Sequence, residues 1–265
     1  MRNGLSPWAK WTAGALVCVL GLGLAPEAGW AQPDTTVVRI AFVGDSMADG
    51  LWGALFRRLG KDKCLAEKVK LLRKAKNGTG LTRLDQFNWI DEVAAIANDS
   101  GADMFVASVG INDRQPIVGP DKTRTDFGGP AFDTRYQANV RDLIERATAK
   151  DASILIVGLP VMLDADANAD AQAKNRIFAA AVKASDTPRA AFASPWTSQP
   201  APDEYKPFLP NSRNAMVQVR ATDGIHFTTF GYDLVMDSIY PSILASLKQR
   251  GRDLNTECSA EVGVR

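Results

Sequence analysis

A single histidine, His226, occurs in the 265-residue chain, and an acid, Asp223, lies three residues before it. Residues three apart in a turn are close in space, so the Asp223 carboxylate can reach Nδ1 of the imidazole ring. The other ring nitrogen, Nε2, can then accept a proton from a serine hydroxyl. This arrangement is that of a Ser-His-Asp triad, and it requires a fold that brings a serine to His226.

Ser46 is the candidate nucleophile, because it follows an apolar run, residues 37–43, that ends in Gly44 and Asp45. β-branched and aromatic residues without strict alternation are typical of a buried strand in a parallel sheet. The next segment, 49–59, carries leucines at helical spacing. Ser46 is therefore predicted in the turn between a strand and a helix, where free amides and the positive end of the helix dipole face its Oγ.

The rest of the chain alternates between apolar runs and helical patterns. Further strands are predicted at residues 68–75, 103–109, 153–160 and 190–193, and further helices at 89–97, 136–147, 169–183 and from 229 to 247, where Pro241 is expected to cause a kink. Strands that alternate with helices predict a parallel sheet covered on both faces. We expect one three-layer α/β/α domain with about five parallel strands, flavodoxin-like in outline, over residues 32–265.

Glycine and polar residues follow two further predicted strands. Gly78 and Gly80 lie in a short glycine-rich loop, and Gly110 lies two residues before Asn112. The carboxyl ends of parallel strands meet at one edge of a sheet, where α/β proteins bind ligands. Residues 113–115, Asp-Arg-Gln, either line this site or lie on the surface. The loop 114–134 is predicted to lie over the same edge. The loop 194–213 either forms part of the wall of the substrate site or is a surface loop without a role in the site.

The sequence resembles the SGNH (GDSL) hydrolases over residues 37–248. That family has four conserved blocks, which contribute a serine, a glycine, an asparagine and an Asp-x-x-His segment, and this chain has these segments in the same order. The segments Gly-Thr-Gly-Leu, Asn-Asp-Arg-Gln and Asp-Gly-Ile-His-Phe-Thr are most similar to an exported bacterial branch, the DUF459 group. The resemblance implies the SGNH hydrolase fold and a catalytic triad of Ser46, Asp223 and His226.

The same resemblance implies an oxyanion hole made by the backbone amides of Ser46 and Gly80 and the side-chain amide of Asn112. Gly78 is the alternative to Gly80, because the two glycines are too close together in the sequence to be distinguished. Gly110 would let the backbone beside Asn112 approach the site.

The segment 44–48, Gly-Asp-Ser-Met-Ala, also nearly matches the Gly-x-Ser-x-Gly nucleophile elbow of α/β-hydrolases. In that fold the serine follows a strand deep within the sheet, after several earlier strands, whereas only one strand is predicted before Ser46. Its acid and histidine also come from separate loops. The SGNH interpretation is therefore favoured.

Residues 1–31 have the pattern of a secretory signal peptide. Arg2 and Lys10 precede a short apolar stretch, 12–25, and the segment ends in Ala-Gly-Trp-Ala at residue 31. We expect cleavage near Ala31, a periplasmic or secreted location, and no stable membrane span after cleavage. The alternative is an uncleaved amino-terminal anchor.

Without residues 1–31, basic and acidic residues are equal in number, so the charge predicts no nucleic-acid binding. Two cysteines remain, Cys64 and Cys258. In an oxidising compartment they would form a disulfide, and the alternative is two separate thiols. With one histidine and two distant cysteines, the sequence does not favour a metal site, and no cofactor is expected.

The predicted function is that of an exported serine esterase. Its substrate would be a small O-acyl ester, such as an acetyl ester on a cell-envelope glycan, cleaved through an acyl-serine intermediate. One alternative is an O-acyltransferase that uses the same triad. A second alternative, from another class, is a periplasmic glycan-binding protein without catalysis.

Overall fold

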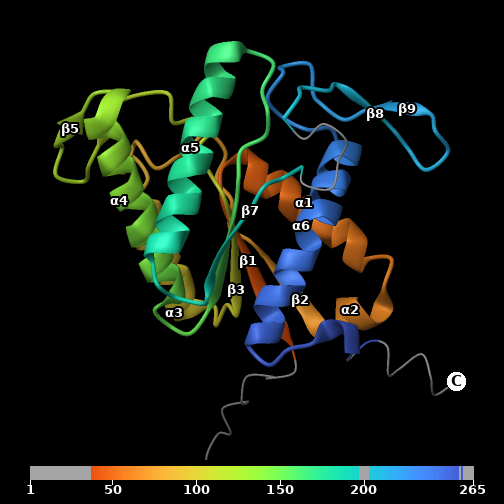
Figure 1. Ribbon diagram of the computed structural model, residues 1–265. Helices are drawn as coiled ribbons and strands as arrows, with labels where there is room; N and C mark the ends of the chain where they lie inside the picture. Colours follow the sequence, from red (N-terminus) through yellow and green to blue (C-terminus); the bar gives the residue numbers. More distant parts are fainter. Residues whose placement is uncertain (1–36, 197–202, 257, 259–265) are drawn as a thin grey trace, which may run out of the picture. The chain divides into compact units, whose positions relative to one another are not determined.

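The computed structural model describes residues 37–196, 203–256 and 258, all within the unit Thr35–Arg265 (Figure 1). The predicted signal peptide, residues 1–31, lies outside the described residues. No helix in the described part of the chain is long and apolar enough to cross a membrane.

A five-stranded parallel sheet forms the centre of this unit. Its strands, in order across the sheet, are β2 (Val69–Arg73), β1 (Val38–Gly44), β3 (Met104–Ser108), β6 (Ser153–Val157) and β7 (Ala190–Ala193). Counted along the chain, this is the 2-1-3-4-5 order of flavodoxin-like folds. The predicted fold class is therefore confirmed. The register pairs Gly44 of β1 with Ser108 of β3, so these two strands end side by side.

Helices cover both faces of the sheet (Figure 1). One face packs against α3 (Trp89–Asp99), α4 (Gly129–Thr148) and α5 (Ala165–Ala184), and the other against α1 (Ser46–Leu59) and α6 (Thr229–Gln249). Along β1, Ala41 and Val43 face the first group of helices, whereas Ile40 and Phe42 face the second. Both faces of β1 are buried, as its unbroken apolar sequence predicts.

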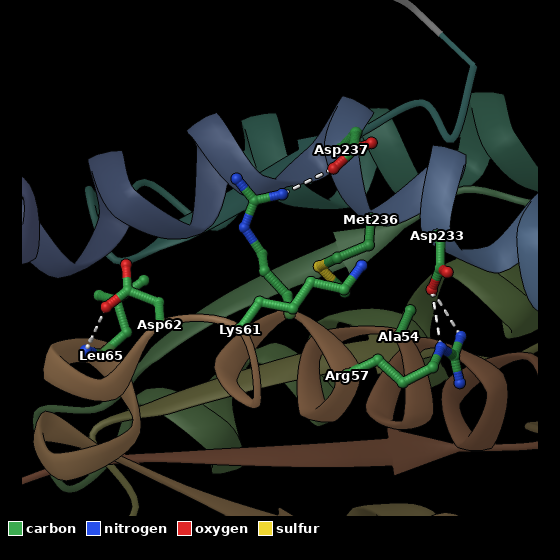
Figure 2. Close-up of a pocket in the computed structure, with 9 residues that line it drawn as sticks. Ala54, Arg57, Lys61, Asp62, Leu65, Asp233, Met236 and Asp237 are labelled. Carbon is green, nitrogen blue, oxygen red and sulfur yellow. Dashed lines mark hydrogen bonds and ion pairs between the residues drawn. The ribbon is translucent and has the colours of Figure 1, made fainter. Parts of the chain in front are cut away.

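Helices α1 and α6 are joined by ion pairs as well as apolar contacts. Arg57 pairs with Asp233 at 2.6 Å, and Arg58 pairs with Asp237 at the same distance (Figure 2). α1 starts at the carboxyl edge of the sheet and runs back along it, so its end lies at the opposite edge. α6 also starts near the carboxyl edge, and the two helices together form one covering layer.

Short elements differ from the sequence prediction. Lys68, predicted to begin a strand, instead ends a helix, α2 (Lys63–Lys68), and the predicted loops contain two small hairpins. These are β4 (Ile117–Val118) with β5 (Arg124–Thr125), and β8 (Phe208–Pro210) with β9 (Met216–Gln218). Two-stranded hairpins are marginal by themselves. Their formation depends on tertiary contacts that periodicity does not reveal.

Cys64 of α2 and Cys258, which follows α6, form a disulfide. The bond connects two segments separated by 194 residues in the sequence. It lies at the end of α1 and the end of α6, which is the edge of the sheet opposite to the carboxyl ends of the strands.

Candidate active site

Ser46 is the first residue of α1, directly after the carboxyl end of β1. Asp45 is the N-cap, and its side chain accepts a hydrogen bond from the Met47 amide. Gly44 has a φ of +125°, and a Cβ there would lie 1.9 Å from the carbonyl oxygen of Ser108. A glycine is therefore required for β1 to turn sharply beside β3. This turn places the Ser46 amide among the free N–H groups at the start of the helix.

The structure brings Ser46, His226 and Asp223 together from opposite ends of the chain. Ser46 Oγ lies 2.6 Å from Nε2 of His226, and Nδ1 of His226 lies 2.7 Å from Oδ2 of Asp223. The other carboxylate oxygen, Oδ1, accepts hydrogen bonds from the amides of Ile225 and His226, both at 2.9 Å. The turn therefore orients both the acid and the ring. This geometry allows the serine hydroxyl to pass its proton to the histidine.

Asp223 is suited to remain ionised. Its partial burial acts to raise its pKa, but the hydrogen bonds from the Ile225 amide and from the ring and amide of His226 outweigh this and lower the pKa. The side chains of Asp223 and His226 are 46% and 32% exposed. Water can therefore reach the acid and the base.

Arg220 supports the turn that carries Asp223 and His226. Its buried guanidinium donates to the carbonyl oxygens of Val161 at 2.6 Å and Ile225 at 2.7 Å. Its planar group also lies over the rings of Tyr205 and Phe227. Burial lowers the pKa of Arg220 to about 10. Arg220 was not predicted from the sequence, because a lone arginine near a loop gives no periodic signal.

Asp113 holds the glycine-rich loop in place. This fully buried carboxylate accepts hydrogen bonds from the amides of Leu81 at 2.8 Å and Thr82 at 3.2 Å, and from the hydroxyls of Thr82 and Tyr136. The sequence left open whether Asp113 lines the site or lies on the surface, and the structure shows that it is internal. Its role could have been suspected only from its position next to Asn112.

Asn112 and Gly80 lie on two loops that contact each other. The side-chain Nδ2 of Asn112 donates to the carbonyl oxygen of Thr79 at 2.9 Å, and its second N–H has no acceptor in the described part of the chain. The Gly80 amide has no acceptor among the described residues. A Cβ on Gly78 would meet nothing within 4 Å, whereas Gly80 is packed against Asp113. The packing favours Gly80 over Gly78 as the oxyanion donor.

Asp45 links the serine to the Asn112 loop. Its Oδ2 accepts hydrogen bonds from the amides of Gly110 at 2.9 Å and Ile111 at 3.4 Å. Burial raises the pKa of Asp45 to about 7, although the amides of Met47 and Gly110 oppose this. Gly110 has a φ of +124°, a conformation that glycine adopts readily. The backbone before Asn112 is therefore fixed directly to the residue before Ser46.

Two buried carboxylates thus connect the three predicted oxyanion donors. Asp45, next to Ser46, binds amides next to Asn112. Asp113, next to Asn112, binds amides next to Gly80. Donors held in this way need little rearrangement when negative charge develops on a bound carbonyl oxygen.

Arg114, Gln115 and the loop 194–213 were also considered as parts of the site. Arg114 pairs with Asp170 at 2.5 Å, and Gln115 donates to the carbonyl oxygen of Asn112. In the loop 194–213, Trp196 is buried against Phe227, so this part belongs to the core, while residues 197–202 lie outside the described part.

A separate pocket of about 320 Å³ between α1 and α6 contains no residue of the triad (Figure 2). Its lining includes the two ion pairs that join these helices. Within the ranges that the structure describes, no group of three or more histidine, cysteine, aspartate or glutamate side chains could hold a metal ion.

Comparisons with known proteins give one family and several related folds. The family model "Protein of unknown function (DUF459)" matches residues 39–242. No curated protein matches the chain. Among solved structures, an acetyl esterase mutant with an acetate ion has a TM-score of 0.56 at 12% identity, covering 80% of this chain and 99% of that chain.

Two further solved structures are similar to the same extent. A carbohydrate esterase family 3 protein from Talaromyces cellulolyticus has a TM-score of 0.55 at 13% identity, covering 80% of this chain and 99% of its own. A mutant acetyl-xylooligosaccharide esterase from Geobacillus has a TM-score of 0.55 at 16% identity, covering 78% and 95%. At these identities, the matches support the SGNH hydrolase fold predicted from the sequence blocks.

Proposed function

The chain belongs to the DUF459 family, and we propose that it is an exported serine esterase that removes a small O-acyl group, such as acetyl, from a cell-envelope glycan. The observation that carries the proposal is the contact between Ser46 Oγ and His226 Nε2 at 2.6 Å, with Asp223 on the other ring nitrogen. A serine with a positioned base and an orienting acid is the arrangement of nucleophilic acyl transfer.

In the proposed reaction, Ser46 Oγ attacks the ester carbonyl carbon while its proton passes to Nε2 of His226. The carbonyl oxygen becomes an oxyanion, which receives hydrogen bonds from the amides of Ser46 and Gly80 and from the side chain of Asn112. As the tetrahedral intermediate collapses, the C–O bond to the alcohol breaks, and His226 returns the proton to the departing oxygen. Ser46 is left as an acyl ester.

In the second half, His226 takes a proton from water, and the hydroxide oxygen attacks the acyl-serine carbonyl. The bond to Ser46 breaks, Ser46 regains its proton from His226, and the carboxylic acid leaves. The exposure of Asp223 and His226 supports water as the acceptor, because a transferase must keep water away from the acyl-serine.

The acetylated glycan is proposed from the solved structures, several of which are described as acetyl or carbohydrate esterases. A direct experiment measures turnover of para-nitrophenyl acetate and of acetylated envelope oligosaccharides by the mature protein. Ser46→Ala and His226→Ala should each reduce kcat by about 10⁶-fold, as in other triads. Ser212→Ala, which changes an exposed serine elsewhere, is the matched control. A His226→Ala variant that keeps a tenth of the activity would rule out the triad.

We also propose that residues 1–31 are a cleaved signal peptide and that the protein works in the periplasm or outside the cell. The Cys64–Cys258 disulfide supports this compartment, since such bonds persist mainly in oxidising environments. Intact mass measurement of protein from the periplasmic fraction tests it. A mature amino terminus near residue 32 is expected, and full-length protein retained in the membrane would favour the anchor instead.

A further inference from the structure

We propose that a small pocket beside the triad, with Lys174 in its wall, is a subsite for an uncharged hydroxyl or carbonyl oxygen of the substrate. The inference rests on the proposed esterase function and narrows its substrate class. The preferred ester would carry an oxygen a few atoms away from the scissile carbonyl, on either its acyl or its alcohol part.

The pocket is next to the candidate catalytic residues. Ile111, which directly precedes Asn112, and Ile225, which directly precedes His226, both line it. Leu159 and Met162, which follow β6, provide further apolar wall. A substrate held by the oxyanion donors would therefore have one of its substituents close to this pocket.

The size of the pocket limits what can enter. Its volume is about 80 Å³. An engineered protein cavity of roughly 150 Å³ holds one benzene molecule, so a pocket of this volume holds only a few non-hydrogen atoms. A complete sugar ring or a long acyl chain would not fit, whereas a short acyl substituent or one edge of a sugar would.

Lys174 lines the pocket without a polar partner in the part of the chain that the structure describes. It extends from α5 and is only 3% exposed. Among the described residues, its ammonium group forms no ion pair and no hydrogen bond, and it lies 5.7 and 6.0 Å from the ring centroids of Phe127 and Tyr136. The Lys174 nitrogen is not among the described side-chain atoms that are shut off from solvent without a hydrogen-bond partner, so its three N–H donors reach the space of the pocket.

The other charged groups near the pocket are already matched. Arg114 and Asp170 line it and pair with each other at 2.5 Å, and both oxygens of Asp113 accept hydrogen bonds. Burial lowers the pKa of Lys174, and the charges of Asp113 and Asp170 act against this. A ligand oxygen in the pocket would accept a hydrogen bond from the Lys174 ammonium in place of water.

The charged side chains near Lys174 favour an uncharged ligand over an anion. Asp113, Asp170 and Asp133 carry negative charge near Lys174, against the positive charge of Arg114. A bound anion would therefore be repelled more than attracted by these four side chains, whereas an uncharged oxygen would not be repelled. The apolar walls and the donor from Lys174 together suit a short carbon chain that bears a hydroxyl or a carbonyl group.

The test compares matched esters in two arms. In the acyl arm, kcat/KM is measured for para-nitrophenyl butyrate and its β-hydroxylated analogue. In the alcohol arm, it is measured for cyclohexylmethyl acetate and for a hexose acetylated on its primary hydroxyl. The variants are Lys174→Met and Lys183→Met, the second of which changes an exposed lysine on the same helix.

The wild-type protein and Lys183→Met should prefer the oxygenated ester in one arm, and that arm identifies the part of the substrate that enters the pocket. In Lys174→Met, the preference should fall about 10- to 100-fold, the range for a hydrogen bond to a charged group. Lys174→Gln, which keeps two N–H donors, should retain part of it. If neither arm shows a preference in the wild-type protein, or if Lys174→Met and Lys174→Gln leave it unchanged, the proposal is wrong.

A binding measurement separates this result from a failure of the proposed function. If no ester is turned over, the esterase proposal fails, and the subsite is examined in Ser46→Ala protein by calorimetric titration with the same unhydrolysed ester pairs. Tighter binding of the oxygenated ester, lost when Lys174→Met is added, supports the subsite independently of turnover. Equal binding of both members of each pair overturns it.

Discussion

The carboxylate of Asp113 occupies the space that a side chain at Gly80 would need. A Cβ built on Gly80 would lie 1.9 Å from Oδ1 of Asp113. The same carboxylate accepts hydrogen bonds from the amides of Leu81 and Thr82, which follow Gly80. The position of the Gly80 amide is therefore tied to the position of Asp113, and through it to the neighbouring Asn112.

Gly80→Ala should displace Asp113 and move the loop that carries the proposed oxyanion donor. We expect kcat to fall by about 10²- to 10³-fold, the cost of losing one such donor. Gly78→Ala is the control, because Gly78 has a φ of +75° but open space around it. It should reduce stability by about 1 to 2 kcal/mol and leave kcat within a few-fold. Steady-state kinetics that show the reverse order would make Gly78 the donor.

Asn112→Ala should lower kcat by about 10²- to 10³-fold with little change in KM, because its amide is needed mainly when charge develops on the carbonyl oxygen. Gln115→Ala is a useful comparison, since Gln115 donates a hydrogen bond to the backbone carbonyl of Asn112 and not to its side chain. Initial-rate kinetics with para-nitrophenyl acetate provide the measurement. A large rise in KM at unchanged kcat would place Asn112 in substrate binding instead.

The raised pKa of Asp45 predicts a pH dependence of stability. Burial raises this pKa from 3.8 to about 7, so between these values the folded protein holds a proton that the unfolded chain has lost. The contribution of this proton to the free energy of unfolding is complete below pH 3.8 and is lost as the pH rises through about 7. At about 1.4 kcal/mol per pKa unit, the free energy of unfolding of the wild type, relative to Asp45→Asn, should fall by up to about 4 kcal/mol.

Urea unfolding of both proteins at several pH values from 4 to 8 measures this difference. A difference that rises with pH, or that stays constant, would show that Asp45 is ionised throughout this range.

The Cys64–Cys258 disulfide should stabilise the fold without affecting the reaction. It closes a loop between residues 194 apart, and removing such a bond typically costs 2–5 kcal/mol. The Cys64→Ser, Cys258→Ser double variant should lose about this much free energy of unfolding and keep its kcat, because the bond lies at the edge of the sheet opposite to Ser46. Peptide mapping without reduction tests the bond itself. Alkylation of both cysteines in unreduced protein would contradict it.

The sequence was most informative where a strand ends in polar residues. An apolar run followed by Gly44, Asp45 and Ser46 predicted both the strand and the position of the serine, and the strand-helix alternation predicted the parallel sheet. Helix ends were less accurate: α4 begins at Gly129, inside the predicted loop 114–134, and α5 begins at Ala165 instead of 169. Such boundaries depend on caps and local contacts more than on periodicity.

The supporting residues could not be predicted in the same way. Asp113, Arg220 and Lys174 are charged, and charged residues are normally exposed, so nothing in the pattern separates these buried side chains from surface ones. Their roles depend on distant backbone groups, such as the carbonyl of Val161 that Arg220 binds. Only the folded structure brings these partners together.

In the proposed reaction, His226 activates Ser46 as a nucleophile. Reaction of the mature protein with a fluorophosphonate probe, followed by peptide mass spectrometry, tests it directly. We expect a phosphonyl adduct on Ser46 in the wild type, none at this position in Ser46→Ala, and far slower labelling in His226→Ala. An unlabelled Ser46 in folded wild-type protein, or labelling at the same rate in His226→Ala, would contradict it.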